Sequence, residues 1–585
     1  MHTPTALQRL LVFVTLLGLV LSACTIAPTA EPTVTVGPTA AVPQPTVAPT
    51  QPPAATDAPT QPPATEPPPE PTATTEPAVD KYGGTLIVTY AQEPTSFDPP
   101  RAFSTMDWGT AAQLLYNGVY VFDANNNLAP DLAADMPEIS ADGLVYTVHL
   151  KEGVLFHNGR ELVADDVKYS IERNSMPDSG SWNATQPMQN IVGGPAVIEG
   201  TAETAEGIVV VDDYTIEFQL LEPNAYFLHS LTLVTNFIVP REVVEEWGED
   251  FSFHPVGTGP FLMTEWTPGE QVVFERNPDY FVEGLPYLDG IVYELGAEPA
   301  VSLLRFEQGE VDVIADGVPS AEIARVATDP NLAPLFLNTK TYLTAFLGFN
   351  NETPPFDNPD VRRALGMAID RDRLIQLGSN TGAAADVWYP ASHYNCTGNT
   401  DAYPYDPDAA RQLLADAGYE DGFQVQGWFR TVRPWLDRIP EAVQQDLAAI
   451  GVELELLQLE SAVATEMLNS GELPIFIQAW GASFPDPFNF ATELFASTST
   501  YGRRWRYNNP QVDELVAQAR QDVDPESRCE TWLEIEGLVL ADTPAAPLFV
   551  AGYPDLQSPR IQDFAYHDTY HRPRYEQIWI APEDR

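Results

Sequence analysis

Basic residues are scarce in this chain. Its 585 residues include 29 lysines and arginines against 83 aspartates and glutamates, a formal net charge of −54. Nucleic acid is therefore not expected as a partner, because phosphate contacts need clustered basic side chains. An anionic membrane surface is not expected either, for the same reason. The first 79 residues hold one base and five acids, so the acidity belongs to the rest of the chain.

Familiar catalytic and metal-binding motifs are also missing. The chain has no His-Glu-x-x-His sequence, no Gly-x-Ser-x-Gly elbow, and no phosphate or calcium loop. His567 and His571 are four residues apart, but their Tyr/Asp/Arg/Pro-rich surroundings are not typical of a helix, so surface histidines are expected. Residues 257–260 (GTGP) lack dinucleotide-binding spacing and are interpreted as a tight turn between strands. We therefore expect no metal and no cofactor.

Only three cysteines occur, and the first belongs to an N-terminal processing signal. Arg9 precedes an apolar run at 10–20, which is too short to span a bilayer and has the length of a signal-peptide core. Small residues then lead to Cys24, as in the lipobox of bacterial lipoproteins. Cys396 and Cys529 either form a disulfide, which an oxidising compartment permits, or remain as two buried thiols.

Residues 25–79 are almost entirely Pro, Thr and Ala, with a few acids. Such a segment cannot bury apolar area and should not fold. Its proline content stiffens it toward polyproline II, with a reach on the order of 170 Å when fully extended. The segment is interpreted as a stalk that holds the folded part away from a membrane.

Hydrophobic residues make up 44% of the chain, and its length corresponds to three or four domain-sized units. Short apolar or alternating runs predict strands, and runs with apolar residues at helical spacing predict helices between them. The fold class is therefore α/β. The predicted strands are 85–90, 144–150, 214–220, 271–275 and 452–456, and the predicted helices are 164–173, 441–450 and those beginning at Asn358 and Asp406.

Several aromatic residues follow apolar, strand-like runs. They are Trp428, Phe429, Trp480 and Phe484. Loops at strand ends are where α/β proteins bind ligands, often in a crevice between lobes. Burial in a core is the alternative for each of these residues.

A series of short motifs resembles the extracytoplasmic solute-binding proteins of oligopeptide, dipeptide and nickel ABC importers. The resemblance runs from about residue 82 to the end, and the order and spacing of the motifs make it specific. The motifs are 92–99 (QEPTSFDP), 128–132, 142–144, 150–154, 156–159, 164–167, 170–173, 257–261, 268–269, 276–281, 355–356, 361–362, 368–371, 413–414 and 417–419.

The resemblance implies a periplasmic-binding-protein-like clam of class II type, with two lobes, a hinge and an extra domain inserted in the first lobe. Closure around a solute would be followed by docking on ABC permease subunits, without any reaction on the solute. A monomer is expected, anchored to the outer face of the cell membrane through Cys24. The expected boundaries are 1–23 for the signal peptide, 24–79 for the lipidated cysteine and stalk, 80–118, 226–350 and 546–585 for lobe I, 119–225 for inserted domain II, and 351–545 for lobe III.

The family's ligand loop follows a Trp at a strand end, which corresponds here to residues 479–487 (AWGASFPDP). In oligopeptide binders the position of Ser483 holds an aspartate that pairs with the peptide's α-amino group, and a hydroxyl is not an equal substitute. Asp486 is the alternative carboxylate for that role. Arg430 would clamp a carboxylate or remain a surface charge. The expected ligand-binding residues are Phe97, Trp428, Phe429, Arg430, Trp480, Ser483, Phe484 and Asp486.

An oligopeptide is the expected solute, and an oligosaccharide or another small solute is the alternative within the same family. Sugar sites use aromatic stacking and neutral hydrogen bonds, which Trp428, Trp480 and Ser483 would suit. From other functional classes, an extracellular hydrolase and a chemosensory or scaffolding protein without transport remain as alternatives.

Overall fold

The computed structural model describes residues 80–585, apart from 103–104, 111–113, 124, 379–380, 390–395, 397, 400–401, 430–437, 484–485 and 568–571. The predicted signal peptide, Cys24 and the stalk lie outside the described residues. Residues Pro77–Arg585 form one compact unit.

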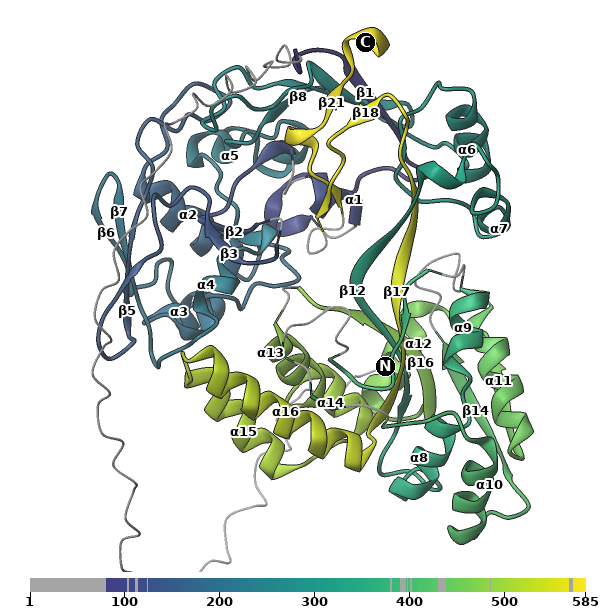
Figure 1. The fold of residues 1–585 in the computed structure, drawn as a ribbon. Coiled ribbons are helices and arrows are strands. Elements are labelled where there is room, and N and C mark those ends of the chain that lie inside the picture. The colour runs from purple at the N-terminus through teal and green to yellow at the C-terminus, as the bar shows by residue number, and fades with distance from the viewer. Residues whose placement is uncertain are drawn as a thin grey trace, which may run out of the picture. The chain divides into compact units, whose positions relative to one another are not determined.

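The first half of the folded chain builds a five-stranded and a four-stranded sheet (Figure 1). The five-stranded sheet has the order β11 (Val313–Ile314), β1 (Thr85–Thr89), β10 (Gly290–Glu294), β9 (Gln271–Arg276), β8 (Phe261–Thr267). The four-stranded sheet is antiparallel, with the order β4 (Glu138–Ile139), β5 (Val145–His149), β7 (Thr215–Gln219), β6 (Ile208–Asp212). Each sheet has its own hydrophobic core.

The second half builds a six-stranded mixed sheet with two hydrophobic cores, so its central strands are apolar on both faces. Its order is β13 (Ala383–Ala384), β17 (Ala545–Leu556), β12 (Phe336–Phe349), β16 (Ile475–Gly481), β14 (Phe423–Phe429), β15 (Val452–Leu457). Three two-stranded ribbons complete the described strands: β2 (Tyr120–Phe122) with β3 (Leu128–Pro130), β18 (Ile561–Gln562) with β21 (Trp579–Ile580), and β19 (Tyr566–His567) with β20 (Arg572–Pro573).

Helices alternate with these strands along the chain. They are α1 (Thr105–Thr110), α2 (Ala164–Ser175), α3 (Gly194–Ile198), α4 (Phe227–Ser230), α5 (Arg241–Trp247), α6 (Pro299–Glu307), α7 (Ile323–Val326), α8 (Pro359–Met367), α9 (Arg371–Leu377), α10 (Pro407–Asp416), α11 (Ile439–Ala449), α12 (Ser461–Ser470), α13 (Pro487–Phe490), α14 (Thr500–Trp505), α15 (Pro510–Gln521) and α16 (Pro525–Asp542). Among the described residues, no helix is both long enough and apolar enough to cross a membrane.

The elements predicted from local patterns are confirmed. The side chain of Asn358 accepts a hydrogen bond from the backbone of Asp360 at 2.9 Å and starts α8, and Asp406 caps α10 in the same way. Both helices have proline at their first position, where a missing N–H costs nothing. The predicted strands and the remaining helices correspond to β1, β5, β7, β9, β15, α2 and α11.

The glycine-rich segment 257–260 is not the turn between strands that its sequence suggests. It is a bend that follows a 3-10 helix (Gly248–Phe253) and leads into β8. A Cβ atom on Gly257 would lie 2.1 Å from the carbonyl oxygen of Leu115, and one on Gly259 would lie 2.3 Å from that of Leu114. The glycines are therefore needed for close approach of two backbones.

Two long strands connect the first half of the folded chain to the second. β12 and β17 run antiparallel, paired from Phe336 with Leu556 to Gly348 with Ala545 (Figure 1). Their pairing register shifts between Lys340 and Thr344. Beside one end, the backbone N–H of Val318 donates to Pro554. The chain thus passes to the six-stranded sheet along β12 and returns along β17.

A buried carboxyl group lies where β3 meets the turn after α1. Asp131 accepts hydrogen bonds from Asn117 Nδ2 at 3.0 and 3.1 Å and from the backbone of Gly118 at 3.1 Å. Burial raises the pKa of Asp131 to about 6, although these donors and Lys151 oppose the shift.

The raised pKa of Asp131 makes a prediction about stability and pH. The native state binds the proton of the Asp131 carboxyl more tightly than the unfolded chain does, where the pKa of this carboxyl is 3.8. The stabilisation of the native state by this proton is therefore complete below pH 3.8. It is lost as the pH rises to about 6. Asp131→Asn should remove this loss, so the variant gains stability relative to the wild type between these pH values and keeps the gain above them. Urea denaturation at pH 3.5, 5 and 7 measures the difference, and a constant difference would contradict the assignment.

Candidate functional site

The candidate site lies at one edge of the six-stranded sheet. β14 and β16 are parallel neighbours, with Trp428 beside Phe476 and Phe429 beside Ile477. Their carboxyl ends therefore point to the same edge, where α/β sheets bind ligands. The loop that follows β16 contains the predicted ligand segment.

Trp480 and Ser483 are placed at this edge. Trp480 pairs through its backbone with Thr344 of the connecting strand β12, and its side chain is half-buried. Its ring packs edge-to-face on Phe490, with centroids 5.0 Å apart and planes at 77°. The backbone N–H of half-buried Ser483 donates to Asn489 Oδ1 at 2.7 Å. Contacts with α13 thus hold both residues at the edge of the sheet where β14 and β16 end.

Asp486 is engaged within the protein. Its carboxylate accepts from the backbone N–H of Phe488 at 2.8 Å, which caps α13, and lies 3.8 Å from the guanidinium of Arg528. Burial raises the pKa of Asp486, and these two partners oppose the shift. In this arrangement Asp486 is a helix cap and an ion-pair partner for Arg528.

The other predicted residues divide into buried and undescribed ones. Phe97 is fully buried in the core of the five-stranded sheet, against Trp266 and Phe274. Trp428 is 4% exposed and packs in one core of the six-stranded sheet, whereas half-buried Phe429 packs against the other. Arg430 and Phe484 lie outside the described residues.

The residues that join the start of α4 to α13 and α16 were not predicted from the sequence. The ring of Tyr226 stacks on Phe488, with centroids 3.6 Å apart and planes at 12°. The guanidinium carbon of Arg528 lies 5.1 Å from the Tyr226 ring centre, and Trp532 Nε1 donates to the Tyr226 hydroxyl at 3.3 Å. The only local signal was the Asp486-Pro487 dipeptide, which is typical of a helix start.

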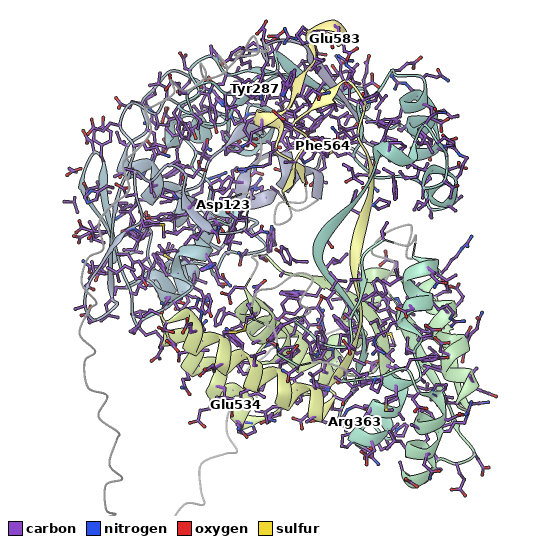
Figure 2. The ribbon with its side chains drawn as sticks, viewed as in Figure 1. Asp123, Tyr287, Arg363, Glu534, Phe564 and Glu583 are labelled. Carbon is purple, nitrogen blue, oxygen red and sulfur yellow. A yellow bond between two sulfur atoms is a disulfide. The ribbon has the colours of Figure 1, made fainter. Side chains whose placement is uncertain are left out.

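A disulfide fastens one further segment beside the site. Cys396 and Cys529 are bonded, with Cα atoms 5.6 Å apart. In the same segment, Glu536 of α16 accepts from the backbone of Tyr389 at 2.8 Å and from Asn399 at 2.9 Å. The Tyr389 ring in turn lies 5.8 Å from Phe490. The outer face of α16 carries exposed Glu534 (Figure 2).

The described residues contain no cluster of three or more His, Cys, Asp or Glu side chains that could hold a metal ion. What they do bring together is an edge where half-buried Trp480 and Ser483 are held by buried Phe490 and Asn489. The exposed parts of Trp480 and Ser483 can bind a solute by stacking and hydrogen bonds.

Comparisons with known proteins identify the family. Residues 127–502 match the model described as bacterial extracellular solute-binding proteins, family 5 Middle. Heme-binding protein A of Haemophilus influenzae is 29% identical over 502 residues, covering 82% of this chain and 89% of that protein. Di/tripeptide-binding protein 2 of Pseudomonas aeruginosa is 28% identical over 489 residues, covering 80% and 90%.

Solved structures share the fold. The clavulanic acid biosynthesis oligopeptide binding protein 2 superposes with a TM-score of 0.78 at 24% identity, over 86% of this chain and 96% of that one. The expected fold class, a two-lobe clam of the periplasmic-binding-protein type with an inserted domain, is thus confirmed. The relatives are solute-binding proteins and not enzymes, so the hydrolase alternative is not favoured. The chain therefore belongs to the bacterial extracellular solute-binding proteins of family 5, and it is an extracytoplasmic substrate-binding protein of a peptide-type ABC importer.

Proposed function

We propose that this protein captures a peptide-like solute between its two lobes, closes over it by hinge motion, and delivers it to the ABC permease subunits. The observation that carries the proposal is the position of Trp480 and Ser483, at the carboxyl edge of the six-stranded sheet and beside the connecting strand β12. A solute held there touches the element on which the lobes would turn, so binding and closure are coupled.

We place lobe I at 80–118, 226–350 and 546–585, the inserted domain at 119–225, and lobe III at 351–545. Three observations support these boundaries: the separate cores of the three sheets, the passage of the chain along β12, and its return along β17. Helix α4 packs on the inserted domain, because Phe227 lies in the core of the four-stranded sheet.

We further propose that Cys24 carries the lipid that anchors the protein to the outer face of the cell membrane. The short apolar run and the small residues before Cys24 support this step. The stalk at 25–79 would then give the lobes their distance from the membrane and from the permease.

Within the site, we assign solute stacking to Trp480 and hydrogen bonding to Ser483, and we keep Phe429, Arg430 and Phe484 as further proposed solute contacts. The proposed solute is a peptide whose α-amino group is not held by the carboxylate at position 486. Two features support this assignment: the serine at position 483, and the engagement of Asp486 with Phe488 and Arg528.

Native mass spectrometry of gently purified protein tests the proposal. We expect a family of co-purified masses that differ by amino-acid residues, which vanishes after unfolding and refolding. A series spaced by hexose units would contradict the peptide assignment and support the oligosaccharide alternative. Persistent absence of any bound solute, together with turnover of peptides or glycosides by the pure protein, would contradict solute capture itself.

A further inference from the structure

The contact of Tyr226, at the start of α4, with α13 and α16 joins two parts of the protein that the proposed hinge closure brings together. On one side, Tyr226 precedes α4, whose Phe227 packs on Tyr146 of the four-stranded sheet at 5.0 Å. On the other side, Phe488, Arg528 and Trp532 come from α13 and α16, which belong to lobe III. Tyr226 opens the 226–350 segment of lobe I, and the adjoining Phe227 packs on the inserted domain. The contact therefore bridges this part of the protein, which we call the inserted-domain side, and lobe III.

This contact is a packed and desolvated one. Tyr226, Phe488 and Trp532 are 4%, 6% and 1% exposed. Phe488 also meets Trp532 edge-to-face at 5.5 Å. Tyr226 thus stacks on Phe488, accepts a hydrogen bond from Trp532 and lies beside the guanidinium of Arg528. Stacked rings and a cation over a buried ring are among the stronger side-chain contacts that a small area can make.

A backbone hydrogen bond crosses at the same place. The N–H of Ala225 donates to the carbonyl oxygen of Arg520 at 2.9 Å, and the Arg520 side chain lies 3.9 Å from Glu222. Beside the stack lies a partly open space with a volume of about 30 Å³, lined by polar groups that include Asn190, Asn224 and Asn489. That volume is about that of one water molecule and too small for a solute.

We propose that Tyr226, Phe488, Arg528 and Trp532 form a clasp that holds the inserted-domain side against lobe III without any solute bound. The clasp also positions the solute loop, because Asp486, at the end of that loop, pairs with the same Arg528 that covers Tyr226. The clasp raises the population of the closed form, and apparent affinity is proportional to that population. Clasp residues thereby set affinity without contacting the solute.

This inference rests on the proposed hinge closure, but its test uses no solute, so the two can fail separately. The measurement is hydrogen–deuterium exchange at the amide of Ala225, in molecules that native mass spectrometry shows to be empty. Phe488→Ala alters only lobe III, yet it should speed exchange at Ala225 about tenfold, because the stack holds the two sides together. Arg528→Gln should also speed exchange at Ala225, and it replaces Phe488→Ala as the test variant if Phe488→Ala does not fold.

Tyr419→Ala is the matched control. Tyr419 is another lobe III aromatic, half-buried where Phe488 is buried, and it packs on Phe423 at 5.4 Å and on the other core of the six-stranded sheet. Its replacement should leave exchange at Ala225 unchanged. The clasp is refuted if the Ala225 amide exchanges at the wild-type rate in both the Phe488→Ala and the Arg528→Gln variants. It is equally refuted if this amide exchanges in the empty wild type as fast as in an unfolded peptide.

Discussion

Replacing Arg371 by methionine should lower the free energy of unfolding by about 3–5 kcal/mol. Arg371 is 7% exposed and donates to five backbone carbonyls, those of Gly366, Ile369, Ala385, Tyr403 and Pro547, at 2.9 to 3.4 Å. Burial lowers the pKa of Arg371 to about 10, so it stays charged at neutral pH. Methionine fills a similar volume without a donor, and each carbonyl that loses its partner costs free energy.

Arg363→Met is the matched control, measured by the same urea denaturation followed by near-ultraviolet circular dichroism. Arg363 lies on α8 at the outer surface of lobe III (Figure 2) and donates to the carbonyl of Ala541 at 3.0 Å. Its loss should cost less than about 1 kcal/mol, since water can replace it. Equal effects of the two substitutions would show that the carbonyl cage around Arg371 does not stabilise lobe III.

Local patterns in the sequence were enough to predict most of the elements that position the site. The helix starts at Asn358 and Asp406 need only a side-chain acceptor and a following proline, both of which are neighbours in the chain. The apolar run before Trp480 likewise indicated a strand, and β16 spans Ile475–Gly481. The role of Arg371 could not be predicted in this way, because one of its carbonyl partners is 176 residues away in the sequence.

The choice between core and pocket aromatics could not be made from the sequence. Trp428 and Phe429 point to opposite faces of β14, but each face of this sheet carries its own hydrophobic core. Alternation therefore does not separate a solute-facing residue from a buried one. Tyr226 was missed for a different reason, since its partner Trp532 lies 306 residues away and no local pattern marks such a pair.

Replacing Trp480 by alanine should weaken solute binding roughly thirtyfold, about 2 kcal/mol, in calorimetric titrations with the solute that mass spectrometry identifies. The indole is half-buried and packs edge-to-face on Phe490, so part of it remains accessible near the end of β16. Truncation removes a rigid stacking surface, while the backbone pairing with Thr344 can persist.

Trp247→Ala is the control for loss of an indole in general. Trp247 is 39% exposed and stacks on His254 at 3.4 Å in the first half of the folded chain. Its replacement should change affinity less than about twofold. Trp480→Phe should recover most of the loss, because a smaller ring can still stack. If Trp480→Ala binds as the wild type does, the solute lies elsewhere, and the aromatic edge made by Trp480 and Phe490 is part of the lobe III core alone.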